Sequence, residues 1–203
     1  MQLLKMQTAT LPDPVLDRRE AVPALLGDFS SFLAVAGLAG AAQELIYLSQ
    51  ESPSVFGLVG AMGAALPMAI GLALAQPKRR VLCHTGDAEL LMTLGALATA
   101  AVMNPPNLRI VVVDNGRFGE TGNQQSHTGL GTRIDTIAAG CGIPAVMVVN
   151  TADEIPAARA LLHDGDGLCF ILLRVKEGPA LKLRRDLRAH PERDRFRRAL
   201  LGK

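Results

Sequence analysis

The sequence predicts an α/β fold: a parallel β-sheet with helices on both of its faces. Segments with the character of strands and of helices alternate along the chain, which is typical of this architecture. The expected strands are unbroken apolar runs, as in strands that are buried on both faces of a sheet. A chain of 203 residues, 49% of them hydrophobic, is long enough to bury one such core. We therefore expect one folded domain.

The first half of the chain predicts three helices and two strands. An amphipathic pattern indicates the first helix, and apolar runs indicate the strands. An uncharged, glycine-rich stretch contains Pro67 in its middle, which favours a loop that leads into a buried helix. In order, we expect an extended lead-in over 1–16, a helix over 16–26, a strand over 32–36, a helix over 41–49, the glycine-rich stretch with its helix over 55–75, and a strand over 80–84.

The second half continues the alternation. Thr151 and Glu154 form the pattern of a capping box and mark the start of the last expected helix. Residues 116–132 are too polar and too rich in glycine for regular structure, and they predict a loop that covers a cofactor. In order, we expect a helix over 88–103, a β-branched strand over 108–113, the loop, a helix over 134–141, a strand over 145–149, a helix over 152–163 and a strand over 168–175.

Polar residues follow two of these strands at the point where each strand ends. The turn Gly86-Asp87-Ala88 and the pair Asp114-Asn115 are separated by 25 residues. Parallel neighbouring strands joined by a crossover helix would place Asp87 and Asn115 side by side at the carboxyl edge of the sheet. A carboxylate, an amide oxygen and a main-chain carbonyl suit Mg²⁺, which completes its shell with phosphate oxygens. Asp87 alone could equally be a helix N-cap, but the spacing favours a metal site with a diphosphate cofactor.

Several motifs in one order resemble the thiamine-diphosphate-binding domain of the thiamine-dependent 2-oxo acid decarboxylases, in particular the phosphonopyruvate and sulfopyruvate decarboxylase group. The family fingerprint is Gly-Asp-Gly, some two dozen residues, then Asn-Asn. The resemblance runs from about Arg18 to Arg174 and implies such a domain over 17–178, followed by a basic segment over 179–203. The motifs are Arg18-Arg19-Glu20-Ala21, Gln43-Glu44-Leu45, Gly60-Ala61-Met62-Gly63, Gly86-Asp87-Ala88, Gly95-Ala96-Leu97-Ala98-Thr99, Asp114-Asn115-Gly116 and Thr121-Gly122-Asn123-Gln124.

The resemblance also implies how the cofactor is held. Asp87, Asn115 and the main-chain carbonyl of Arg117 would bind Mg²⁺. The carbonyl of Gly60 would accept a hydrogen bond from the aminopyrimidine ring, and Met62 would wedge the cofactor into its bent shape; the alternative for Met62 is a buried core methionine. The whole expected cofactor-binding set is Gly37, Gly60, Ala61, Met62, Gly86, Asp87, Ala88, Glu89, Asn115, Phe118, Gly119, Glu120 and Thr121.

Two residues of the expected loop are candidates for catalysis. Glu120 puts a second carboxylate near the site, at a position where related decarboxylases often read Ser-Thr-Gly-x-Gln. His127 could donate a proton to the carbanion, or it could be a surface histidine. His84, within an expected strand, is interpreted as a core histidine. The family's activating glutamate belongs to a separate pyrimidine-binding domain, and nothing in this chain resembles one.

The resemblance therefore implies the cofactor-binding (beta) subunit of a two-subunit 2-oxo acid decarboxylase of the phosphonopyruvate or sulfopyruvate type, which acts on a small 2-oxo acid with a pyrimidine-binding (alpha) partner. Two alternatives stay open: a carboligase subunit of the acetolactate-synthase kind, and a non-catalytic cofactor-binding relic. The relic is suggested by Ala88, where the fingerprint often has Gly, and by Gln43, where the family commonly has Arg.

Composition argues against several other classes. The formal charge is +2 and the excess base is concentrated in residues 182–203, so the core does not imply nucleic acid. Three cysteines without a paired motif predict core residues in a reducing cytoplasm. Residues 55–75 reach the length of a membrane span, but glycines and Pro67 interrupt them. With the helix over 88–103 they are better explained as a small-residue face that packs against a second cofactor domain in a homo-oligomer.

Overall fold

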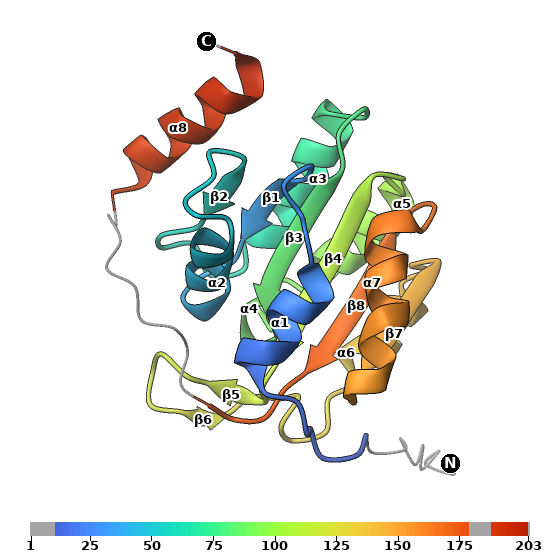
Figure 1. Ribbon diagram of the computed structural model, residues 1–203. Coiled ribbons are helices and arrows are strands. Elements are labelled where there is room, and N and C mark those ends of the chain that lie inside the picture. Colours follow the sequence, from blue (N-terminus) through green and yellow to red (C-terminus); the bar gives the residue numbers. More distant parts are fainter. Residues whose placement is uncertain (1–10, 179–187, 203) are drawn as a thin grey trace.

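The computed structural model describes residues 11–178 and 188–202, and its centre is a six-stranded parallel sheet (Figure 1). The expected parallel α/β architecture is confirmed. The strands, in their order across the sheet, are β2 (Val55–Gly57), β1 (Leu33–Ala36), β3 (Val81–Gly86), β4 (Leu108–Asp114), β8 (Cys169–Arg174) and β7 (Ala145–Val149). Every residue of the central strand β4 is buried, which explains why its sequence is mostly apolar.

Helices cover both faces of the sheet and divide the core into two layers. Alternate strand residues contribute to each layer: Ala34 and Val111 lie in the one packed by α1, α2 and α7, whereas Val35 and Ile110 lie in the one packed by α3, α5 and α6. The helices are α1 (Arg18–Leu26), α2 (Gly40–Leu48), α3 (Ala65–Ala75), α4 (Asp87–Leu91), α5 (Gly95–Met103), α6 (Ile134–Gly140), α7 (Ile155–Asp164) and α8 (Ala189–Leu201).

Two expected elements differ from the structure, and one strand was not expected. The helix expected over 88–103 is interrupted between α4 and α5, where the N–H groups of Met92 and Thr93 donate to carbonyls three residues earlier, as in a 3₁₀ helix. The hydroxyl of Thr93 also donates to the carbonyl of Gly63 at 2.9 Å. The loop over 116–132 contains a small hairpin, in which β5 (Arg117–Phe118) pairs with β6 (Gln124–Gln125). Strand β2 was not expected, because three residues within a glycine-rich stretch carry no periodicity.

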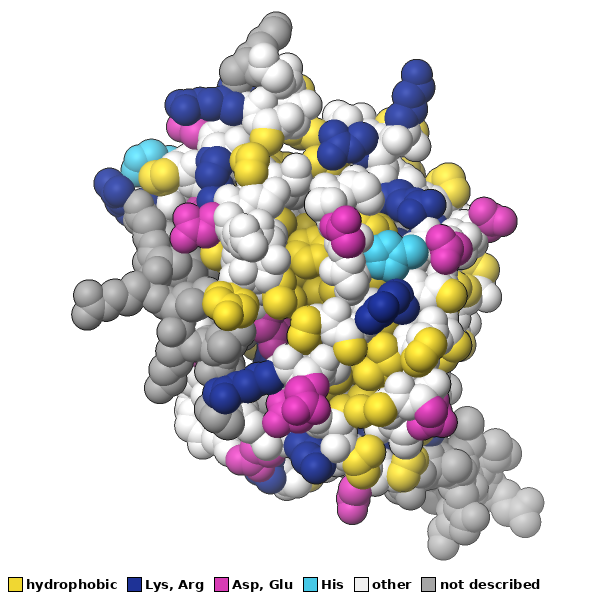
Figure 2. All heavy atoms as spheres, viewed as in Figure 1, with side chains coloured by type: hydrophobic (Ala, Val, Ile, Leu, Met, Phe, Trp, Pro, Cys, Tyr) yellow, Lys and Arg dark blue, Asp and Glu magenta, His cyan; other side chains and the backbone are white. Residues whose placement is uncertain are grey.

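The expected capping box is confirmed at the start of the last sheet-covering helix. Thr151 and Glu154 form it, and the chain makes a 3₁₀ turn, η1 (Ala152–Glu154), before α7 begins. None of the helices within residues 11–178 and 188–202 is long and apolar enough to cross a membrane. Figure 2 shows acidic and basic side chains interspersed on the face that carries α1 and α7.

The described part of the basic C-terminal segment, residues 188–202, packs against its own domain. Helix α8 lies along the edge strand β2, where the rings of Phe196 and Phe56 meet edge-on with centroids 5.6 Å apart. Arg195 donates to the main-chain carbonyl of Glu51 at 3.2 Å. No residue of α8 is fully buried, so the helix packs on β2 while much of its basic surface stays in solvent. Residues 1–10 and 179–187 lie outside the described residues.

Candidate functional site

The carboxyl ends of β3 and β4 lie together, as the spacing of the two motifs predicts. The strands are parallel neighbours, and Gly86 is paired in register with Val113. The next residue of each strand is therefore an aspartate, Asp87 after Gly86 and Asp114 after Val113, and both are buried. The site begins with these two carboxylates at one edge of the sheet.

A hydroxyl from the loop after β4 joins the two carboxylates. Thr128 Oγ1 lies 2.8 Å from an oxygen of Asp87 and 2.7 Å from an oxygen of Asp114. Ser126 also donates its hydroxyl to Asp87, and it lies 2.8 Å from Thr128. The loop is held over the edge by the amide of Ser126, which donates to the carbonyl of Gly116 at 2.8 Å. The sequence reasoning did not identify Asp114, Ser126 or Thr128 as site residues.

The electrostatics of this cluster favour a cation. Burial, together with the charge of Asp114, raises the pKa of Asp87 to about 6. Burial likewise raises the pKa of Asp114. The hydroxyls of Ser126 and Thr128 are neutral, and the single nearby cation among the described residues is the guanidinium of Arg174, 3.9 Å from Asp114. Ionisation of both carboxylates therefore leaves an excess of negative charge in a buried place. Carboxylate and hydroxyl oxygens are hard ligands, and the donor set fits Mg²⁺.

The remaining ligands of such an ion would have to be other oxygens. Within the part of the chain that the structure describes, no three His, Cys, Asp or Glu side chains are grouped closely enough to hold a metal. Asn115 is half-buried, and its amide oxygen accepts a hydrogen bond from the backbone N–H of Arg117 at 3.1 Å. An amide oxygen has two lone pairs, so one remains for a metal. The side chain of Arg117 points elsewhere and pairs with Glu177 at 3.2 Å.

Glu89 joins the expected cofactor-binding segments to one another. One of its oxygens accepts from the backbone N–H of Leu38 at 2.8 Å and from the hydroxyl of Thr85 at 3.0 Å. The other oxygen accepts from the N–H of Gly63 at 3.3 Å. Gly37 lies directly against this carboxylate: a Cβ at that position would be 1.9 Å from it. The structure thus brings the loop after β1, the Gly60 segment and α4 together.

The Gly60 segment is open to its surroundings. Gly60, Ala61 and Met62 are exposed, and Met62 shows 43% of its surface. The alternative interpretation of Met62 as a buried core methionine is therefore wrong. Ala88, in contrast, is buried directly behind Asp87. An exposed apolar side chain such as that of Met62 can contact either a bound ligand or another subunit.

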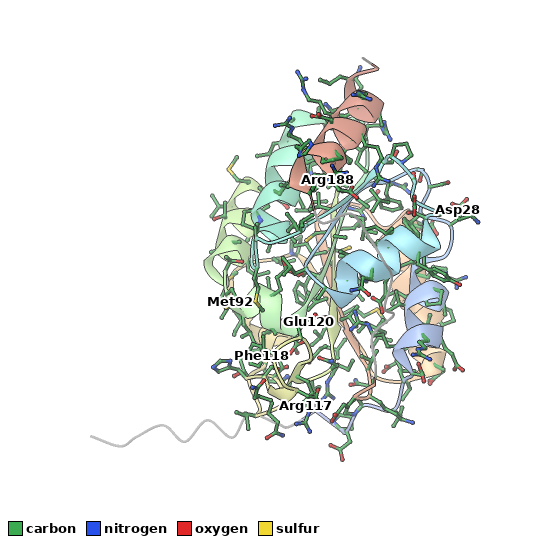
Figure 3. The ribbon with its side chains drawn as sticks, turned by 90° about the vertical axis from the view of Figure 1, so that its left-hand side faces the viewer. Asp28, Met92, Arg117, Phe118, Glu120 and Arg188 are labelled. Atoms are coloured by element: carbon green, nitrogen blue, oxygen red, sulfur yellow. The ribbon has the colours of Figure 1, made fainter. Side chains whose placement is uncertain are left out.

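The two candidate catalytic side chains are exposed. Phe118 is half-buried on β5, whereas Gly119, Glu120, Thr121 and His127 lie on the exposed part of the loop. Figure 3 shows Phe118 and Glu120 near the lower end of the molecule, with Arg117 below them. Among the described residues, Glu120 and His127 make no side-chain hydrogen bond with Asp87 or Asp114. The side chains that the structure joins to Asp87 are thus those of Ser126, Thr128 and Asp114, and the assignment of catalytic roles to Glu120 and His127 stays a prediction.

A second buried network lies behind the site. His84 is fully buried, as expected of a core histidine, and its Nε2 lies 3.1 Å from the carboxylate of Glu44. Arg18 of α1 forms two hydrogen bonds with the same carboxylate. Burial alone would raise the pKa of Glu44, but the hydrogen bonds from His84 and Arg18 outweigh it and lower that pKa. This network links two of the sequence motifs, those at Arg18 and at Glu44.

Comparison with protein families places most of the chain in one of them. Residues 36–172 match the model of the thiamine pyrophosphate enzyme, C-terminal TPP binding domain. The crystal structure of benzoylformate decarboxylase from Polynucleobacter necessarius has a similar fold, with a TM-score of 0.67 and 19% identity over 85% of this chain and 36% of that one.

Three curated relatives show higher identity. The sulfopyruvate decarboxylase subunit beta of Methanothermobacter thermautotrophicus is 35% identical over 93% of this chain and 97% of its own length. That of Methanocaldococcus jannaschii is 39% identical over 51% of this chain and 54% of its own length. The phosphonopyruvate decarboxylase of Streptomyces hygroscopicus is 34% identical over 91% of this chain, but the match spans only 46% of that protein.

Proposed function

Because the chain belongs to the thiamine pyrophosphate enzyme family, through that family's C-terminal TPP-binding domain, we propose that it is the thiamine-diphosphate- and Mg²⁺-binding (beta) subunit of a two-subunit 2-oxo acid decarboxylase. The observation that carries the proposal is the pair of buried carboxylates, Asp87 and Asp114, at the carboxyl edge of neighbouring parallel strands. They lie where open α/β sheets bind their ligands, and their combined negative charge favours a bound cation.

Each part of the site has a proposed task. Asp87, the amide oxygen of Asn115 and the carbonyl of Arg117 would hold Mg²⁺, which would neutralise charge on the diphosphate. The carbonyl of Gly60 and the side chain of Met62 would orient the aminopyrimidine ring. Thiamine diphosphate, when bound, supplies the electron sink that 2-oxo acid decarboxylation requires. The protein's contribution is then to hold, bend and shield that group.

The loop after β4 is proposed to supply the proton donor of the reaction. Glu120 lies in the turn of the hairpin formed by β5 and β6, and His127 follows that hairpin. Both side chains are exposed, so closure of the loop over a bound substrate would bring them inward. We assign proton donation to the carbanion to one of these two side chains. Substitution of each by Ala, with the other as control, distinguishes them by the rate of product formation in the assembled enzyme.

The partner and the substrate follow from the relatives. Two of the relatives are named as beta subunits, which supports a pyrimidine-binding alpha partner that would contribute the activating glutamate. The substrate proposed is a small 2-oxo acid of the sulfopyruvate or phosphonopyruvate type. The three free cysteines support a cytoplasmic setting.

Calorimetric titration with thiamine diphosphate tests the metal site. We expect Mg²⁺-dependent binding by the unmodified chain and a loss of at least 100-fold in affinity for Asp87→Asn, because the amide has the shape of the carboxylate without its charge. Asp153→Ala, which removes an exposed carboxylate that follows the edge strand β7 rather than β3 or β4, is the control and should leave the affinity unchanged. An unchanged affinity in Asp87→Asn would refute the metal assignment.

A further inference from the structure

The carboxylate of Glu89 occupies a cradle of hydrogen-bond donors. The Glu89 side chain belongs to a residue that is only 4% exposed, and it accepts from the N–H groups of Leu38 and Gly63 and from the hydroxyl of Thr85. The backbone of Ala65 donates to it as well. Each of these donors is neutral, so they solvate a buried negative charge with dipoles alone.

The donors have the arrangement of an anion-binding site. Leu38 belongs to the loop after β1, Gly63 and Ala65 to the loop and first turn that lead into α3, and Thr85 to the end of β3. N–H groups from separate loops that converge on one point form a concavity for phosphate groups. Gly37 provides the floor, since a Cβ there would lie 1.9 Å from Glu89 and 2.9 Å from the hydroxyl of Thr85. An anion can approach this backbone only because the residue is glycine.

The cradle is next to the proposed metal site. Glu89 is two residues beyond Asp87, and both lie in α4 at the carboxyl edge of β3. Strand β1, whose following loop supplies Leu38, is the immediate neighbour of β3 in the sheet. A diphosphate held by a metal at Asp87 would therefore be close to the Glu89 carboxylate and its donors.

We propose that the Glu89 carboxylate is an internal competitor of the cofactor: it occupies the position of one phosphoryl group, so that a diphosphate binds there only when Glu89 leaves the cradle. The inference rests on the proposed function and concerns the same site. Two anions cannot share a set of four neutral donors without strong repulsion. Glu89 thus lowers the affinity of the subunit for the diphosphate group, while its hydrogen bonds hold the donors in place when no diphosphate is bound.

The opposite role for Glu89 is that of a tether. Its hydrogen bonds hold three segments of the site in place, and a pure tether would make the cofactor bind more tightly when it is present. The two roles therefore predict opposite signs: removal of a competitor strengthens binding of diphosphate, whereas removal of a tether weakens it.

The test compares the full chain with Glu89→Ala and Glu89→Gln by calorimetric titration with inorganic diphosphate and with thiamine diphosphate, both with Mg²⁺. We expect Glu89→Ala to bind each at least tenfold more tightly than the unmodified chain, and Glu89→Gln to bind several-fold more tightly, because it keeps the size and loses the charge. Glu20→Ala removes an exposed carboxylate on α1 and should change neither affinity more than twofold.

Thermal unfolding gives a second readout that a tether does not predict. Inorganic phosphate should raise the melting temperature of Glu89→Ala more than that of the unmodified chain at matched ionic strength in chloride, because the free anion refills the cradle. Should Glu89→Ala fail to fold, the affinity of Glu89→Gln for diphosphate distinguishes the competitor from the tether.

The outcomes separate the inference from the proposed function. If the unmodified chain binds thiamine diphosphate with Mg²⁺ but neither variant binds more tightly, the competitor is overturned and the proposed function stands. If neither the unmodified chain nor any folded variant binds thiamine diphosphate, the proposed function fails. Tighter binding of inorganic diphosphate by the variants supports the cradle in either case.

Discussion

Asp87 is the residue in which stability and ligand binding are most directly opposed. Its pKa is raised to about 6 by burial and by the neighbouring charge of Asp114. A carboxyl whose pKa is higher in the folded chain than in the unfolded one stabilises the fold below the unfolded pKa, and that contribution is lost as the pH rises through the folded pKa. In the metal-free protein, the ionised carboxylate of Asp87 therefore lowers the free energy of unfolding at neutral pH.

A pH series on the metal-free protein tests this effect of Asp87 on stability. Between pH 4 and pH 6, the free energy of unfolding should fall more steeply with pH in the unmodified chain than in Asp87→Asn, which cannot ionise. Urea denaturation in a chelator measures it. Added Mg²⁺ should restore stability above pH 6 in the unmodified chain only. Parallel pH profiles for the two proteins would contradict the raised pKa.

At the scale of elements, the longer strands were predictable, the edge strand β7 among them, whereas the short edge strand β2 was not. The apolar runs of β3 and β4 are long and buried on both faces, so their pattern is unambiguous, and the residues that follow them mark the site. Strand β2 and the break between α4 and α5 depend on tertiary contacts, such as the bond between Thr93 and Gly63, which no local pattern contains.

The same limit applies to the site. That Asp87 and Asn115 lie at one edge of the sheet could be predicted, because the ends of parallel strands share an edge. Ser126 and Thr128 reach Asp87 only through the fold of the loop after β4, and single hydroxyl residues in a polar loop carry no signal of their own. The carboxylate of Asp114 was visible in the sequence, but only its burial beside Asp87 reveals its effect.

Helix α8 offers a test of packing at this scale. Phe196 is half-buried against Phe56 on the edge strand β2. Phe196→Ala should lower the free energy of unfolding by about 1–3 kcal/mol, since it removes apolar contacts from a partly covered site. Arg197→Ala, on the exposed side of the same helix, is the control and should change it by less than about 0.5 kcal/mol. Equal stabilities in urea denaturation would show that α8 does not pack on β2.

At the scale of the whole molecule, the apolar side chains on α3 and α5 require an explanation. Met68 and Leu74 on α3 and Val102 and Met103 on α5 are exposed, and the two helices contact each other on one face of the sheet. The small residues Ala65 and Ala69 instead point into the chain's own core. An interface with a second copy of the chain would therefore use the larger side chains.

We expect at least a homodimer of the isolated chain. Met68→Arg combined with Val102→Arg should shift it to monomer, because each places an unpaired charge at the contact. Tyr47→Arg, an exposed position on α2 across the sheet, is the control and should leave the oligomer intact. Light scattering coupled to size exclusion reports the mass. A monodisperse monomer of the unmodified chain at micromolar concentration would contradict this interface.

The central claim is that this chain supplies the cofactor-binding half of a decarboxylase whose other half is a separate subunit. The most direct measurement is release of CO₂ from sulfopyruvate and from phosphonopyruvate by the chain saturated with thiamine diphosphate and Mg²⁺, with and without a pyrimidine-binding alpha subunit of a related sulfopyruvate decarboxylase. We expect no turnover by the chain alone and turnover in the mixture, with the aldehyde as product rather than a carboligation product. Robust decarboxylation by the chain alone would contradict the account.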